Sequence, residues 1–185
     1  VLVEFRTGFA KWLNVKKNIF PDVQGKEYYF IDALAASGEN PEGVFEEFIS
    51  DGGFCDWLEP NPDAHRFLKE LKAAGYWIHI LTARPDDNLN CFYDTFDWLK
   101  RYDLHFDDIS FSAEKFRWCA KSKYYDDGAI KFAIDDSPKH ATEYATHGML
   151  CYVPKKPYNE KQWNINGVVP YDSFLQLISF VKNSG

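Results

Sequence analysis

Short apolar runs that end in polar residues alternate along this chain with segments of helical periodicity. Four runs rich in aromatic and β-branched residues predict strands, and they cover 76–81, 109–111, 129–134 and 149–153. Around them, apolar residues recur at the three- and four-residue spacing of helices, at 61–74, 88–101, 138–147 and 172–181. This alternation predicts an α/β fold, with a Rossmann-like parallel sheet and helices on both faces.

Capping residues mark the expected starts of two helices. Asn61 is expected to cap a helix that begins at Pro62. Ser137 is expected to cap a helix that begins at Pro138. Asn and Ser accept hydrogen bonds from the first free amides of a helix, and proline suits its first position.

The stretch from 9 to 58 departs from this alternation. Polar turns, glycines and prolines such as Pro21 and Pro41 interrupt short helical runs there. We therefore expect a small helical cap, inserted near the N-terminus and covering 9–58. The rest of the chain, 1–8 and 59–185, is expected to form one core domain.

Composition mainly excludes partners. The chain has 185 residues, 45% of them apolar, which is enough to form a core. Its net charge of −7 disfavours binding to long nucleic acid but does not exclude small anionic substrates. No stretch reaches transmembrane length and no signal peptide is visible, so no membrane partner is expected. The scattered cysteines indicate reduced thiols and a cytoplasmic protein. A homodimer is compatible with the aromatic content, but nothing in the pattern requires one.

The apolar run at 129–134 ends in two adjacent carboxylates, Asp135 and Asp136. Two carboxylates at the end of an inner strand repel each other, so both stay ionised only at a cost. A hard cation such as Mg²⁺ removes that cost. The alternative is an acidic strand-to-helix turn in which one Asp caps the following helix. These residues alone do not decide between the two interpretations.

A second polar tip follows the run at 76–81. Thr82 offers a hydroxyl group, and Ala83 and Arg84 offer backbone amides. The guanidinium group of Arg84 also suits phosphate oxygens. In an open parallel sheet such tips gather at the carboxyl edge, where ligands bind. The alternative is that Thr82 only caps the next helix, but the two tips together favour a phosphate site.

Leu-Thr-Ala-Arg at 81–84, a lysine downstream and Ile-Asp-Asp-Ser-Pro at 134–138 resemble motifs two, three and four of the haloacid dehalogenase (HAD) superfamily of phosphohydrolases. Phe5, Gly-Phe at 53–54 and Trp-Leu-Glu-Pro at 57–60 resemble its 5'(3')-deoxyribonucleotidase-like branch, in which a helical cap follows the first motif. The resemblance covers nearly the whole chain. It implies a HAD-like fold and a Mg²⁺-dependent phosphomonoesterase that hydrolyses nucleoside monophosphates through an aspartyl-phosphate.

One motif of that family is missing from this chain. The family carries Asp-x-Asp on its first strand, where one Asp attacks phosphorus and the other acts as general acid and base, and the pattern continues into Val-Leu. This chain begins with Val1-Leu2, so the resemblance implies that the motif lies immediately before residue 1. The alternatives are a catalytically silent nucleotide- or phosphate-binding protein on the same fold, or a HAD phosphatase that acts on another small phosphate ester.

The resemblance assigns roles to both polar tips. It implies that Asp136 and Asp135 hold Mg²⁺. Thr82 would donate to a phosphoryl oxygen, with the Ala83 amide beside it and Arg84 as a further substrate-binding residue. Ala83 stands where the vertebrate deoxyribonucleotidases have a second hydroxyl residue, so the phosphate contacts are expected to differ from theirs.

The motif-three lysine, which neutralises phosphate charge in the family, has more than one candidate. Lys115 follows the run at 109–111 at the family's distance. Lys121 precedes the acidic pair at a distance common elsewhere in the superfamily, and it is slightly preferred. Lys123 is a weaker candidate. The ordinary alternative for each is a solvated surface lysine.

Aromatic residues are the candidates for binding the rest of the substrate, which is expected to be a small phosphorylated molecule and in particular a nucleotide. Phe5 matches the position that stacks on the nucleobase in the deoxyribonucleotidases, and Phe54 and Trp57 are further candidates. The alternative is that these rings belong to the core. His79 lies inside a predicted strand and is expected to be a satisfied core imidazole.

Overall fold

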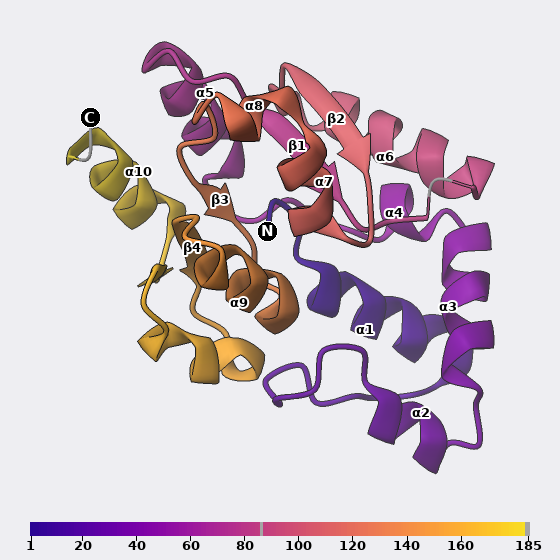
Figure 1. The fold of residues 1–185 in the computed structure, drawn as a ribbon. Coiled ribbons are helices and arrows are strands. Elements are labelled where there is room, and N and C mark those ends of the chain that lie inside the picture. Colours follow the sequence, from indigo (N-terminus) through magenta and orange to yellow (C-terminus); the bar gives the residue numbers. More distant parts are fainter. Residues whose placement is uncertain (86, 184–185) are drawn as a thin grey trace. The chain divides into compact units, whose positions relative to one another are not determined.

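The computed structural model describes residues 1–85 and 87–183, and it divides the chain into two compact units (Figure 1). What we call the sheet unit contains Val1, 62–84 and 105–185, and the helical unit contains 2–61 and 85–104. Residues 86 and 184–185, which belong to the expected core domain, lie outside the described residues.

The described strands lie in the sheet unit and pair in parallel. They are β1 (His79–Thr82), β2 (Asp108–Phe111), β3 (Ala133–Ile134), β4 (Cys151–Pro154) and β5 (Val168–Tyr171). β1 pairs with β2, and β3, β4 and β5 form a second sheet in that order. Cys151 of β4 lies opposite Ala133 on one side and Val168 on the other. The predicted α/β fold with parallel strands is confirmed, although the sequence pattern did not indicate β5.

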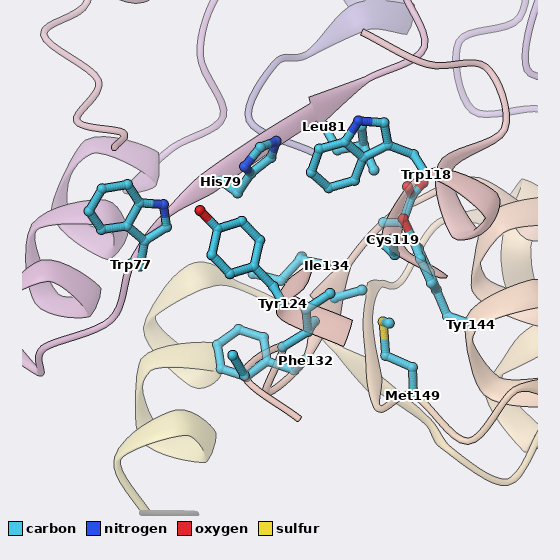
Figure 2. Close-up of a pocket in the computed structure, with 14 residues that line it drawn as sticks. Trp77, His79, Leu81, Trp118, Cys119, Tyr124, Phe132, Ile134, Tyr144 and Met149 are labelled. Atoms are coloured by element: carbon cyan, nitrogen blue, oxygen red, sulfur yellow. The ribbon is translucent and has the colours of Figure 1, made fainter. Parts of the chain in front are cut away.

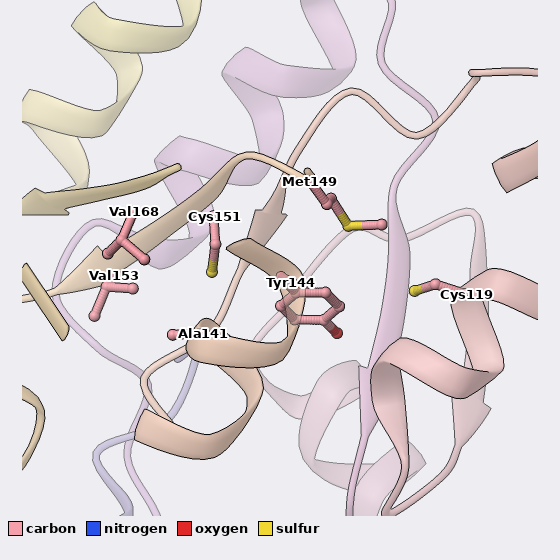
Figure 3. Close-up of a cluster of buried hydrophobic side chains, with 7 residues drawn as sticks. All are labelled: Cys119, Ala141, Tyr144, Met149, Cys151, Val153 and Val168. Carbon is pink, nitrogen blue, oxygen red and sulfur yellow. The ribbon is translucent and has the colours of Figure 1, made fainter. Parts of the chain in front are cut away.

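Helices connect these strands and cover both faces of β4. They are α5 (Ala64–Ala73), α7 (Lys115–Lys121), α8 (Lys123–Asp126), α9 (Pro138–Thr146), α10 (Phe174–Asn183) and the 3₁₀ helix η1 (Pro157–Asn164). Cys151 and Val153 are fully buried and belong to one cluster with Tyr144 of α9 (Figure 3). Tyr152 points to the opposite face, because strand side chains alternate, and stacks on Phe180 of α10 with 6.2 Å between ring centroids. Because helices cover both faces of β4, its side chains are apolar on both faces.

The helical unit is built around aromatic side chains. Its helices are α1 (Phe5–Lys17), α2 (Ile31–Ala36), α3 (Pro41–Ser50), α4 (Gly53–Asp56) and α6 (Leu89–Arg101). The ring of Phe48 in α3 lies 5.0 Å from that of Phe9 and 5.5 Å from that of Trp12, both in α1. An antiparallel bridge between Val3 and Pro60 joins the two ends of the segment that carries the first four of these helices.

Helix α6 packs with the helical unit, so the boundary differs from the expected one, which left 85–104 in the core domain. The indole nitrogen of Trp98 donates to the carbonyl of Leu58 at 2.8 Å. The guanidinium of Arg101 donates to the carbonyl of Cys55 at 2.8 Å. These two bonds satisfy carbonyl groups around the end of α4, which explains why α6 belongs with it.

Helix ends follow the sequence signals in part. The hydroxyl of Ser137 accepts a hydrogen bond from the amide of His140 at 3.5 Å, so this predicted cap is confirmed. Asn61 does not begin a helix, because α5 starts later, at Ala64, and the Asn61 side chain donates instead to the carbonyl of Val3 at 3.3 Å. Within the described residues, none of the helices combines the length and the apolar composition that crossing a membrane requires.

Candidate active site

The acidic pair begins where β3 ends. The amide of Asp135 donates to the carbonyl of Tyr152 at 3.1 Å, so the strand pairing with β4 fixes its backbone. The Asp135 carboxylate is 3% exposed, and each of its oxygens accepts a hydrogen bond. The amide of Ser137 donates at 2.9 Å and the ammonium of Lys115 at 2.7 Å. Pairing and hydrogen bonding of this kind offset the cost of burying a carboxylate.

Of the three candidate lysines, Lys115 is the one that the structure brings to the acidic pair. It is the first residue of α7, and its side chain is 15% exposed. Lys121 is the last residue of α7, where it is exposed, and its charge acts on Glu114. The ammonium of Lys123 lies over the ring of Tyr124, 5.2 Å from its centroid. The geometry therefore favours Lys115, whereas the sequence spacing slightly favoured Lys121.

Asp136 is held by residues that follow β4. One oxygen of its carboxylate accepts a hydrogen bond from the Tyr158 hydroxyl at 2.7 Å. Its backbone carbonyl accepts from the side-chain amide of Asn159 at 3.1 Å. The second carboxylate oxygen lies 3.4 Å from the ammonium group of Val1. The contacts therefore fix Asp136 on both backbone and side chain, while one oxygen faces a positive charge.

Sequence reasoning missed Tyr158 and Asn159. Asn159 is fully buried, and its side chain also donates to the carbonyl of Pro154 at 2.9 Å and accepts from the amide of Lys156 at 3.1 Å. It accepts a further bond from the indole of Trp163 at 2.9 Å. The available signal was a polar Pro-Tyr-Asn step shortly after a strand, at the edge where the other tips lie.

Asp136 is ionised at neutral pH despite its burial. Burial alone would raise its pKa, but the ammonium of Val1, the hydroxyl of Tyr158 and the ammonium of Lys115 together hold the pKa of this carboxyl below its ordinary value. An ionised carboxylate is a ligand type that a hard cation such as Mg²⁺ prefers.

The second tip lies at the carboxyl end of β1, in the same unit. Thr82 is the last residue of β1, and its hydroxyl accepts a hydrogen bond from the amide of Arg84 at 3.3 Å. The carbonyl of Thr82 accepts from the amide of Ser112 at 2.8 Å. Thr82 and Arg84 are partly exposed, and Ala83 is exposed. The turn therefore places the Thr82 hydroxyl at a strand end, where it holds the Arg84 amide, and the phosphate role of these residues stays a prediction.

The candidate aromatic residues lie in the helical unit. Phe5 is 9% exposed and stacks on Tyr28, with 5.5 Å between ring centroids. Phe54 is buried in the same cluster, 6.4 Å from Phe5. Trp57 is partly exposed, with the ammonium of Lys16 over its ring at 6.0 Å. Phe5 and Phe54 thus serve the core of this unit, and base stacking by these rings stays a prediction.

His79 differs from expectation. It lies in β1 as predicted. Its two ring nitrogens are buried without a hydrogen-bond partner, so the prediction that its hydrogen bonds are satisfied in the core is wrong. Burial lowers the pKa of His79, and the carboxylate of Asp108, 3.6 Å away, offsets this only in part. The imidazole is therefore neutral at pH 7, packed 4.5 Å from the ring of Trp118.

The acidic pair fits a part of a magnesium site. Mg²⁺ is commonly held by one or two carboxylates together with waters and substrate phosphate oxygens. The Asp136 carboxylate is oriented by the Tyr158 hydroxyl, and Asp135 stands next to it, paired with Lys115. No cluster of three or more histidine, cysteine or carboxylate side chains that could hold a metal occurs within residues 1–85 and 87–183.

Comparisons with known proteins address the fold. A scan against protein-family models finds no match, and a search of curated proteins finds none. A solved structure of a predicted phosphoglycolate phosphatase from Haemophilus somnus 129PT aligns over 97% of this chain and 93% of its own, with 14% identity and a TM-score of 0.61. A HAD-superfamily hydrolase from Ehrlichia chaffeensis aligns over 98% and 91%, with 14% identity and a TM-score of 0.54. This chain has the HAD-like fold.

Proposed function

We propose that this protein is a Mg²⁺-dependent phosphomonoesterase of the HAD type that hydrolyses nucleoside monophosphates through an aspartyl-phosphate. The observation that carries the proposal is the acidic pair itself. On this fold, a buried Asp135 is paired with Lys115 at 2.7 Å, and the carboxylate of Asp136 beside it is oriented by a hydrogen bond from the Tyr158 hydroxyl at 2.7 Å. Such a pair at the carboxyl end of a parallel strand is suited to a metal and a phosphate.

In this proposal each candidate residue has a distinct role. Asp136, with Asp135 beside it, would hold the metal, which when bound bridges the phosphate and neutralises its developing charge. Lys115 would pair with Asp135 and place positive charge toward the phosphate. Thr82 and the Ala83 amide would orient phosphoryl oxygens, and Arg84 would contact the substrate. Tyr158 and Asn159 would fix the direction of Asp136.

The attacking carboxylate belongs to the same proposal. Asp135 accepts hydrogen bonds on both oxygens, from Ser137 and Lys115, and is poorly suited to attack. We place the Asp-x-Asp motif directly upstream of Val1, whose nitrogen lies 3.4 Å from the Asp136 carboxylate. Residues joined to Val1 there would stand beside the metal ligands, where a nucleophile is needed.

A second candidate substrate is another small phosphate ester. The solved structure with the TM-score of 0.61 is that of a predicted phosphoglycolate phosphatase, and it aligns over 97% of this chain. A nucleotide stays the first candidate because Phe5, Gly-Phe at 53–54 and Trp-Leu-Glu-Pro at 57–60 resemble the deoxyribonucleotidase-like branch of the family.

Phosphate release from a panel of nucleoside monophosphates and small phosphate esters tests the proposal, with and without Mg²⁺, in a chain extended upstream by its genomic sequence. We expect Mg²⁺-dependent release that Asp136→Asn lowers by about a hundredfold or more, because a metal-holding carboxylate is removed. Asp127→Asn, an exposed carboxylate at the end of α8, is the matched control and should leave the rate unchanged.

Each outcome separates the candidates. Wild-type turnover in Asp136→Asn would overturn the phosphatase assignment. Release from small esters but not from nucleotides would keep the chemistry and change the substrate. Nucleotide binding without release from any ester would make this a binding protein on a phosphatase fold.

A further inference from the structure

The carboxylate oxygens of the acidic pair are not equally available to a cation. Both oxygens of Asp135 accept hydrogen bonds, from a backbone amide at 2.9 Å and from the Lys115 ammonium at 2.7 Å. The Oδ2 atom of Asp136 accepts a bond from the Tyr158 hydroxyl at 2.7 Å. The Oδ1 atom of Asp136 lies 3.4 Å from the nitrogen of Val1, beyond the usual length of an N–H···O bond. Oδ1 is therefore the oxygen that a cation can take without breaking a short hydrogen bond.

A buried asparagine fixes the position of Tyr158. Asn159, the next residue in η1, is fully buried. Its side-chain nitrogen donates to the carbonyls of Asp136 at 3.1 Å and of Pro154 at 2.9 Å, and its oxygen accepts two further bonds. These four bonds use the whole hydrogen-bonding capacity of an asparagine side chain. Because a fully satisfied buried network favours one geometry, the backbone of Tyr158 is held against that of Asp136.

The hydrogen bond from Tyr158 limits how Asp136 can bind a cation. A hydroxyl that donates to an ionised carboxylate forms a charge-assisted bond, roughly twice as strong as a bond between neutral groups. A cation that took both oxygens of Asp136 would have to break this bond and deprive the hydroxyl of its acceptor. A cation that takes Oδ1 alone keeps the bond. Asp136 is therefore arranged to bind through one oxygen.

The Asp136 carboxylate lies apart from the apolar cavity of the sheet unit. That cavity, of about 510 Å³, is lined mainly by aromatic and aliphatic side chains, and Figure 2 shows the rings of Trp118 and Tyr124 beside His79. Of the described residues, neither Asp136 nor Tyr158 lines it. Both are partly exposed. Water can therefore complete the coordination of a cation that binds Asp136.

Divalent cations differ in how they use a carboxylate. Mg²⁺ is six-coordinate, with oxygen ligands at about 2.0 to 2.1 Å, and it usually keeps several waters and binds one or two carboxylates. Ca²⁺ takes about six to eight oxygen ligands at about 2.3 to 2.6 Å, and a carboxylate can supply both of its oxygens to it. A carboxylate that offers one oxygen in a fixed direction therefore suits Mg²⁺ and denies Ca²⁺ the two-oxygen contact.

We propose that the Tyr158 hydroxyl, by holding Oδ2 of Asp136, makes this site select a small six-coordinate cation in preference to Ca²⁺. Tyr158 acts through Asp136 and is a positioning residue. The inference rests on the proposed function in one respect, which is that Asp136 holds the metal. It goes further because it assigns the choice of metal to a residue that does not touch the metal.

Metal binding in the absence of any phosphate ester tests this role. The chain extended upstream by its genomic sequence is loaded with Mn²⁺, whose free and bound forms differ in electron paramagnetic resonance, and Mg²⁺ or Ca²⁺ is added as competitor. We expect Tyr158→Phe to lower the ratio of the Ca²⁺ to the Mg²⁺ dissociation constant by about tenfold, because Ca²⁺ gains an oxygen while Mg²⁺ loses a well-directed ligand. Tyr102→Phe is the matched control and should leave the ratio unchanged, because the Tyr102 hydroxyl donates to Glu59, at 2.9 Å, in the helical unit.

The outcomes separate this inference from the proposed function. An unchanged ratio in Tyr158→Phe, with Mg²⁺ still bound by the wild type, would overturn the inference and leave the phosphatase proposal intact. Equal weakening or loss of both cations in Tyr158→Phe would also overturn it, since a merely structural role predicts that result. A wild-type chain that binds none of the three cations would overturn both. The expected change of ratio in a chain that releases no phosphate from any ester would support the role of Tyr158 and overturn the phosphatase.

Discussion

Lys115 and Asp135 form an ion pair that is largely withdrawn from water, with side chains 15% and 4% exposed. Removing one partner of a buried pair leaves the other charge uncompensated, and such losses are larger than the net contribution of the pair. The pair is therefore a stability determinant as well as a candidate catalytic feature. This distinguishes Lys115 from Lys121 by a measurement that needs no substrate.

We expect Lys115→Met to lower the free energy of unfolding by about 3 kcal/mol, because the buried carboxylate of Asp135 then loses its ion-pair partner. Lys121→Met, at the other end of α7, should change the free energy of unfolding by about 0.5 kcal/mol or less, as surface substitutions do. Urea unfolding of the two variants checks this. Equal losses in both would mean that the ion pair with Asp135 is unimportant for stability.

The close packing of helix α1 depends on one glycine, Gly8. A Cβ atom on Gly8 would stand 2.4 Å from the carbonyl oxygen of Trp57 and 2.6 Å from the side chain of Leu58. The helix can approach that backbone only because Gly8 has no side chain. The same feature fixes the start of α1 next to the segment that leads out of α4.

Gly8→Ala should lower the free energy of unfolding by more than about 1 kcal/mol, although alanine is the better helix former, because backbone must move to admit the new methyl group. Gly43→Ala is the matched control in α3, where the nearest atom to the new Cβ is 3.8 Å away. It should raise the free energy of unfolding by about 0.5 to 1 kcal/mol. Thermal and urea unfolding report both changes, and stabilisation by Gly8→Ala would contradict the close approach.

For the molecule as a whole, the sequence predicted the layered α/β fold and the two polar tips, because strand and helix periods and strand-end chemistry are local properties. It did not predict which lysine meets Asp135. Lys115 and Lys121 lie about two helical turns apart on α7, and tertiary packing alone decides which end faces β3. The buried Asn159 was missed for the same reason, since its partners lie in β4 and after β3.

Acid stability also depends on contacts across elements, and Asp107 is the clearest case. Its carboxylate accepts a hydrogen bond from the Lys72 ammonium of α5 and another, at 2.8 Å, from the amide of Ile78, the residue before β1. These two donors lower the pKa of Asp107 below its ordinary value. A lowered carboxyl pKa in the folded state stabilises the protein above the unfolded pKa of about 3.9, and this stabilisation is lost as pH falls through the folded value.

We therefore expect Asp107→Asn to be less stable than the wild type at about pH 7, and the difference between the two to shrink as pH falls below about 4. The reason is that protonation removes from the wild type the same charge that the substitution removes. Urea unfolding at several pH values measures this, with Asp127→Asn as the control that should follow the wild-type profile. Parallel loss of stability in wild type and Asp107→Asn would mean that other carboxylates govern acid unfolding, and that α5 and β1 are joined mainly by apolar packing.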